Sequence, residues 1–150
     1  RQMARMRAVE FSAELTILLI EGPQDKKAAI DLYYGEYQRE FKDGDKVKRE
    51  LVAYLDWLLD ALPGLAKSRF RKPVDLYSLV GALTNHRGRG QSVMVRAQDA
   101  GEYLSDFERE LNRKRPTERA RRYLTAASRQ TDNLRPRLTR IEILDEVLDP

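Results

Sequence analysis

Cysteine is absent from this chain of 150 residues, and there is a single histidine, His86. Without cysteine the protein cannot form a disulfide framework, a thiolate zinc site or a thiol nucleophile. The longest uninterrupted apolar run, residues 17–20, is too short to cross a bilayer. No signal-peptide pattern stands at the N-terminus. We therefore expect a cytoplasmic protein without a membrane partner.

Strand patterns are missing too, because no segment alternates apolar and polar residues. Apolar residues instead recur at every third or fourth position, which predicts amphipathic helices. The expected helices cover residues 2–21, 24–41, 45–62, 73 to the glycine pair at 88 and 90, 91–113, 117–127 and 136–148. This pattern predicts an all-α fold, about seven helices in a single helical domain over residues 1–150. The expected core includes Leu18, Tyr33, Leu51, Leu55, Leu58, Leu79, Leu104, Phe107, Leu124 and Leu144.

Groups that could carry catalysis are scarce. Asp56 and Asp60 share a helix face, but no second ligand cluster accompanies them. No serine stands in a nucleophile elbow, and no glycine-rich phosphate loop is complete. We expect no catalytic residue, no metal site and no cofactor in this chain. His86 fits a helix C-terminus, where a partly positive ring suits the helix dipole.

Around His86 the sequence reads "LTNHRGRGQS", residues 83–92. Its glycines favour a joint between two helices. As a secondary role, Arg87 and Arg89 are candidates for contact with a phosphate.

Arginine is plentiful: it accounts for 20 of the 28 basic residues, against 24 acidic ones. Between residues 109 and 140, eleven Lys and Arg face only three Asp and Glu. Such a segment is typical of a surface that meets a nucleic-acid backbone. The alternative is a solvated face, or arginines paired with acids elsewhere. The candidate contacts in this region are Arg113, Arg115, Arg119, Arg121, Arg122, Arg129, Arg135, Arg137 and Arg140.

Three stretches carry a family resemblance: "RMRAVEFSAELTILLIEGPQDKK" at 5–27, "FRKPVDLYSLVGAL" at 70–83 and "YLTAASRQTDNLRPRLTRIEIL" at 123–144. They resemble the C-terminal helical region of the bacterial GmrSD-like family of restriction and phage-defence proteins. The resemblance implies an N-terminal region with a ParB/sulfiredoxin-like fold and an Asp-Gly-Gln-Gln-Arg motif tied to nucleotide hydrolysis or nuclease action. That motif is absent from this sequence, so no catalytic residue of the family can be assigned.

On this resemblance the chain is expected to be the C-terminal half of a longer protein, without its catalytic region. Its partners would be the N-terminal domain of the same parent chain and DNA, and its role would be to support a nuclease or NTPase domain. The alternative function is a structural or oligomerisation module without nucleic-acid contact. In that case the apolar first helix would pack on a partner domain or on a second copy in a homo-oligomer.

Overall fold

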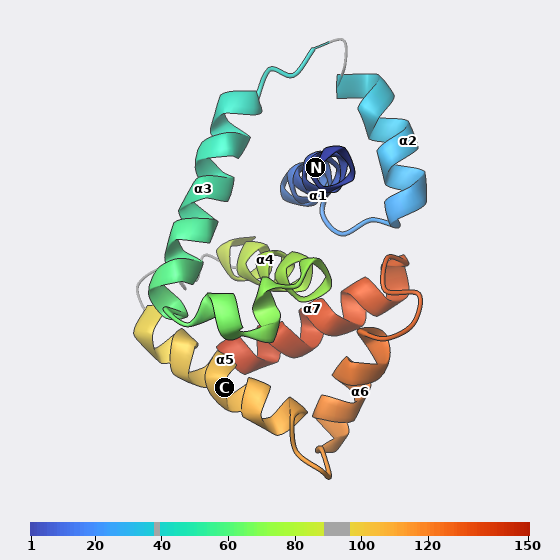
Figure 1. Ribbon diagram of the computed structural model, residues 1–150. Helices are drawn as coiled ribbons and strands as arrows, with labels where there is room; N and C mark the ends of the chain where they lie inside the picture. Colours follow the sequence, from blue (N-terminus) through green and yellow to red (C-terminus); the bar gives the residue numbers. More distant parts are fainter. Residues whose placement is uncertain (38–39, 89–96) are drawn as a thin grey trace.

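The computed structural model describes residues 1–37, 40–88 and 97–150. Within these ranges the chain forms seven α-helices, two short 3-10 helices and no strand (Figure 1), which confirms the all-α prediction. The elements are α1 (Gln2–Glu21), α2 (Lys26–Tyr37), α3 (Gly44–Ala61), η1 (Leu65–Lys67), η2 (Arg69–Arg71), α4 (Pro73–Gly88), α5 (Ala97–Leu111), α6 (Glu118–Ala126) and α7 (Leu134–Leu148).

Local chemistry sets several of the helix ends. Helix α1 stops at Gly22, whose φ of 78° lies in the left-handed region that glycine adopts without strain. Helix α6 begins after Thr117, whose hydroxyl accepts a hydrogen bond from the Ala120 amide at 3.2 Å. The described part of helix α2 covers Lys26–Tyr37, and residues 24, 25, 40 and 41 of the predicted helix over 24–41 are not helical.

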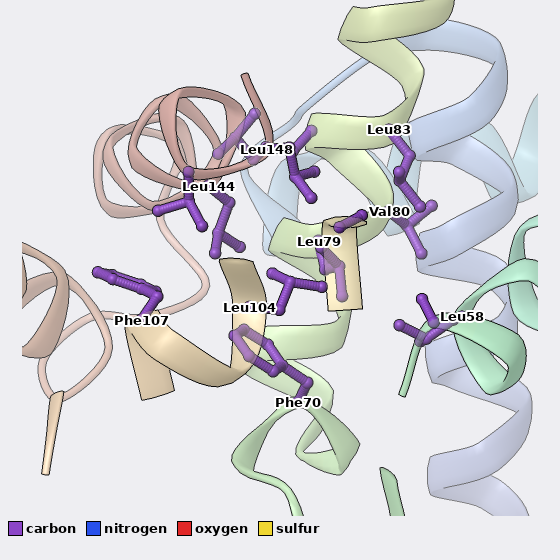
Figure 2. Packing of buried hydrophobic residues seen from close by; sticks show 14 of the residues in the cluster. Leu58, Phe70, Leu79, Val80, Leu83, Leu104, Phe107, Leu144 and Leu148 are labelled. Atoms are coloured by element: carbon purple, nitrogen blue, oxygen red, sulfur yellow. The ribbon is translucent and has the colours of Figure 1, made fainter. Parts of the chain in front are cut away.

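Helix α4 runs through the middle of the molecule and packs against α7, α1 and η2, while α3 packs on α5 and α1 (Figure 1). Its Leu79, Val80 and Leu83 meet Leu104 and Phe107 of α5 and Leu144 of α7 in the main hydrophobic cluster (Figure 2). The core prediction is confirmed for Leu18, Leu58, Leu79, Leu104, Phe107 and Leu144, which are all buried. Leu51 and Leu124 are half-buried against the cluster, and Tyr33 and Leu55 are half-buried as well.

The stretch at residues 65–72, which lies between two of the predicted helices, contributes to this core. It forms the 3-10 helices η1 and η2, and the Phe70 side chain is fully buried. The Ser68 hydroxyl accepts a hydrogen bond from the Phe70 amide at 3.1 Å and starts η2. A single aromatic residue among cations has no periodicity, so the sequence pattern gave no signal for its burial.

Helices α1, α2 and α3 stand on one side of α4, with α1 seen end-on between the other two (Figure 1). Helix α1 buries Leu15, Ile17 and Leu18, whereas α2 buries only Ala29. Helix α2 is therefore held mainly by its contact with α1. None of the described helices is long and apolar enough to span a membrane.

Helices α3 and α5 approach each other closely at Gly101. A Cβ atom added at Gly101 would overlap the carbonyl oxygen of Ala61, which is backbone and cannot turn aside. The neighbouring Ala61 and Ala100 are small and buried, so the two helices meet backbone to backbone. This contact requires glycine at position 101.

We expect Gly101→Ala to lower the free energy of unfolding by about 1–3 kcal/mol, because overpacking outweighs the better helix propensity of alanine. Gly35→Ala in α2 is the matched control, since nothing lies within 4 Å of its added Cβ. That control should raise stability by roughly 0.5–1 kcal/mol. Urea unfolding monitored by circular dichroism gives the free energy of unfolding of both variants. Equal effects of the two substitutions would contradict the packing argument.

Candidate nucleic-acid interface

Two of the candidate arginines lie in the interior and not on a surface. Arg137 is 3% exposed and Arg140 is 1% exposed, so neither can reach a nucleic-acid backbone. This corrects the sequence-based prediction for these two residues. A count of charges along the chain contains no information about burial, and here the apolar stripe of α7 passes through both positions.

Arg140 lies at the centre of a buried polar network. Its Nε donates to the Ser78 hydroxyl at 2.8 Å, and its two terminal nitrogens donate to the carbonyl oxygens of Ala126 and Thr131. Those carbonyls belong to the end of α6 and to the turn that leads into α7. The guanidinium therefore fixes the α6–α7 connection from the inside.

Asp75 is the acid of a second buried polar group, and its charge also acts on Arg140. It accepts a hydrogen bond from the Tyr123 hydroxyl at 2.7 Å and another from Arg69 Nε at 3.2 Å. Burial and the Asp75 carboxylate raise the pKa of Tyr123 well above its usual value, so the hydroxyl stays protonated and donating. The Arg69 guanidinium also lies over the Tyr123 ring, 5.4 Å from its centroid. Helices α4 and α6 and η2 are joined in this way.

Arg137 joins the two ends of the chain. It forms an ion pair with Glu14 of α1, which is also buried, and donates to the Gln24 carbonyl at 2.9 Å. Its guanidinium stacks over the Tyr77 ring at 4.0 Å. Lys26 reaches the same Glu14 carboxylate at 3.0 Å. The role of Arg137 is therefore to dock α1 on α4 and α7.

Arg119 is also engaged within the fold. It donates to Glu110 of α5 at 2.8 Å and lies over the Phe107 ring at 5.3 Å. Burial acts to raise the pKa of Glu110, but hydrogen bonds from Thr117 and Arg119 and the charges of Arg119 and Arg113 outweigh it, so the pKa lies below its usual value. Arg119 is thus a structural residue of the α5–α6 corner.

Four of the remaining candidate arginines lie at a groove between α6 and α7, which we call the Arg groove. It has a volume of about 640 Å³. Its charged lining consists of four arginines and one acid, Glu118, and its neutral polar lining includes hydroxyls and amides. The arginines are Arg121, Arg122, Arg129 and Arg135, all of them exposed.

No ion pair or side-chain hydrogen bond involves these four guanidinium groups anywhere in the described part of the chain. Their donors are therefore directed to solvent. The groove is lined in part by Gln130 of the turn before α7, whose φ of 48° is left-handed and unusual for a residue with a side chain. Arg140 holds this turn in place from below. The groove is thus a fixed concave surface that presents unpaired cations.

The other candidates lie elsewhere. Arg113 and Arg115 are exposed in the connection between α5 and α6, outside the lining of the Arg groove. The candidate arginines of residues 109–140 are therefore divided between the interior, the Arg groove and the exposed connection between α5 and α6. Arg87 lies near the end of α4, but its side chain, like the whole of Arg89, is outside the described residues.

His86 is buried at the end of α4, where its Nε2 lies 2.8 Å from the Asp145 carboxylate of α7. This contact joins two core helices. Within residues 1–37, 40–88 and 97–150 no group of three or more His, Asp or Glu could hold a metal ion. The exposed carboxylates of Asp56 and Asp60 accordingly stand without further ligands around them.

Comparison with known proteins finds no matching family model, no matching curated protein and no matching solved structure. The resemblance to the GmrSD-like family therefore stays a prediction. The Arg groove is the feature of the molecule that bears on its function. Its guanidinium groups can form paired hydrogen bonds with phosphate oxygens, and its hydroxyl and amide groups can add neutral ones.

We expect Arg140→Met to lower the free energy of unfolding by about 2–4 kcal/mol, since the Ala126 and Thr131 carbonyls lose their donors. Arg135→Met, the same change on the exposed side of the same helix, should alter stability by no more than about 0.5 kcal/mol. Urea unfolding at neutral pH measures both. If Arg140→Met changes the free energy of unfolding only slightly, water must satisfy the two carbonyl groups as well as the guanidinium does.

The Arg119–Glu110 pair should contribute stability that depends on pH. Because the folded pKa of Glu110 lies below the usual 4.5, the contribution is complete above that value and is lost as pH falls through the folded pKa. We expect Arg119→Leu to lower the free energy of unfolding by about 1 kcal/mol at pH 7 and by less at pH 3. Unfolding curves across this range test it, with the exposed Arg121→Leu as control. If the difference in unfolding free energy between the wild type and Arg119→Leu does not change with pH, the whole effect comes from packing on Phe107.

Proposed function

We propose that this helical domain binds the phosphate backbone of nucleic acid along the Arg groove. One observation carries the proposal: four exposed arginines converge on one groove and have no acidic partner among the described residues. Surface arginines that serve only solubility are usually interspersed with acids. Here Glu118 is the one acid in the lining. A polyanion is the ligand that best satisfies such a surface.

The chemistry of the groove favours backbone contact over base reading. Guanidinium groups match phosphate oxygens, whereas the described lining contains no aromatic side chain on which a base could stack. Phosphate contacts position a nucleic acid but carry no sequence information. We therefore propose a non-catalytic role, in which the domain holds DNA and another part of a larger protein acts on it.

The resemblance to the GmrSD-like family supplies a context for this proposal. A helical domain of such a protein would support an N-terminal nuclease or NTPase domain and guide DNA to it. Restriction of foreign DNA in the bacterial cytoplasm would then be the activity of the parent protein. The proposal for the groove does not depend on that context, since it follows from the charges and geometry of α6 and α7.

Fluorescence anisotropy with a generic duplex, measured across a salt series, tests the proposal. We expect Arg122→Glu combined with Arg129→Glu to weaken binding equally for unrelated sequences. The log–log slope of affinity against salt should flatten by roughly one unit per arginine. Arg119 is left unchanged, because it pairs with Glu110.

The matched control is Arg49→Glu combined with Arg71→Glu, which changes the net charge equally at exposed positions away from the groove. This control should retain the wild-type slope. Equal weakening by both double variants would mean that diffuse charge, and not the groove, binds the duplex. No binding by the wild type even at low salt would reject the proposal.

A further inference from the structure

The first half of α1 makes an arm that is exposed on every side. All residues from 1 to 9 are exposed, whereas the second half of the same helix is packed in the fold. The arm nevertheless carries large apolar side chains: Met3 is 70% exposed, Met6 67% and Val9 58%. A row of exposed apolar residues at helical spacing is typical of a surface that another helix covers.

The same row continues into an apolar cleft between α1 and α2. Spacings of three and four residues lead from Met6 and Val9 to Ala13 and Ile17, which line the cleft together with Thr16. The opposite wall is aromatic. It consists of Tyr33, Tyr34, Tyr37 and Phe41, and the cleft has a volume of about 240 Å³.

The aromatic wall is held in a fixed arrangement. The rings of Tyr33 and Tyr37 stack at 6.0 Å, and the Phe41 ring packs against Tyr37 at 5.2 Å. The Tyr37 hydroxyl donates to Glu21 at 2.9 Å. Burial, this hydrogen bond and nearby carboxylates raise the pKa of Tyr37 to about 12, so the bond persists at neutral pH.

The arm and the cleft carry opposite charges. Arg1, Arg5 and Arg7 lie on the arm, which has no acid before Glu10. By their helical spacing, Arg5 and Arg7 flank the apolar row on its two sides. At the aromatic wall, the Glu21 carboxylate accepts the Tyr37 hydroxyl hydrogen bond, and the Glu36 carboxylate acts on the same hydroxyl. Glu40, which precedes Phe41 in the chain, pairs with Lys42 at 3.6 Å. The cleft thus fits a basic, methionine-bearing helix.

We propose that the occupant is a second copy of this chain, paired through antiparallel α1 helices about a two-fold axis. Met3 and Met6 of each copy then enter the aromatic cleft of the other. The arm and the cleft lie on one row, with Met3 and Ile17 separated by ~21 Å at the helical rise. A two-fold axis midway between them, near Glu10, places the arm of each copy in the cleft of the other, so that both arm–cleft contacts form together.

The chemistry of the contact supports this pairing. Methionine is flexible enough to fill an irregular cleft, and its sulfur packs favourably on aromatic rings. The flanking arginines of each arm approach the carboxylates around the other cleft. Glu10 would meet its own counterpart near the axis, but it already pairs with Lys26 at 3.4 Å, which reduces the repulsion. The Arg groove takes no part, so this inference is independent of nucleic-acid binding.

Sedimentation equilibrium of the 150-residue chain tests the dimer. We expect a wild-type dimer, and Met3→Asp combined with Met6→Asp should raise its dissociation constant by a factor of roughly a hundred. The matched control is Val52→Asp combined with Leu59→Asp, which places the same charges at exposed apolar positions of α3 and should leave the dimer intact. Circular dichroism confirms that both variants fold. A monomeric wild type at all concentrations would overturn the proposal.

Charge reversal identifies the surfaces that meet. Arg5→Glu with Arg7→Glu reverses the arm, and Glu36→Lys with Glu40→Lys reverses the surroundings of the cleft. Each variant alone should be monomeric, because like charges meet at both contacts. A mixture of the two should form a heterodimer, since every contact again joins opposite charges. A wild-type dimer that both variants retain, or a mixture that stays monomeric, would reject the arm-in-cleft arrangement.

Discussion

The buried guanidinium of Arg140 is the contact on which the arrangement of α4, α6 and α7 depends. It reaches Ser78 on α4, 62 residues away in the sequence, and carbonyl groups at the end of α6 and in the turn before α7, so that one side chain joins α4 to the α6–α7 connection. A buried charge is tolerated only when its donors are satisfied, which makes the surrounding geometry strict. Asp75, Tyr123 and Arg69 form a second buried polar group that joins α4 and α6 to η2. The turn that Arg140 holds contributes Gln130 to the lining of the Arg groove.

Helical periodicity was sufficient to predict the fold class and most of the elements. The stripes through Leu79, Leu104 and Leu144 identify buried faces because helix geometry alone decides which positions share a side. Two features escaped this reasoning for physical reasons. Phe70 is buried in a 3-10 turn, where no period exists to indicate it. The close contact at Gly101 depends on how two helices cross, which no local pattern specifies.

The candidate interface was predicted only in part. Charge counting found the Arg-rich segment, and four of its members do share a groove. Charge counting could not separate these four exposed arginines from the buried Arg137 and Arg140, although the apolar pattern of α7 indicates the burial of both. Both stand on the row that continues through Ile141, Leu144 and Leu148, so an arginine at such a position is a candidate for burial. The acid that pairs with Arg137 was not predictable, because Glu14 lies at the other end of the chain.

The pair formed by Glu14 and Arg137 also has a consequence for biosynthesis. These residues are separated by 123 positions, so Glu14 leaves the ribosome long before its partner is made. Until then α1 has an acid on its docking face and only Lys26 to neutralise it. The first helix can therefore dock fully only after α7 has been synthesised, and the chain completes its folding as a whole and not from the N-terminus onward. Selection would act on positions 14 and 137 together, since either charge alone would be left without its partner in the interior.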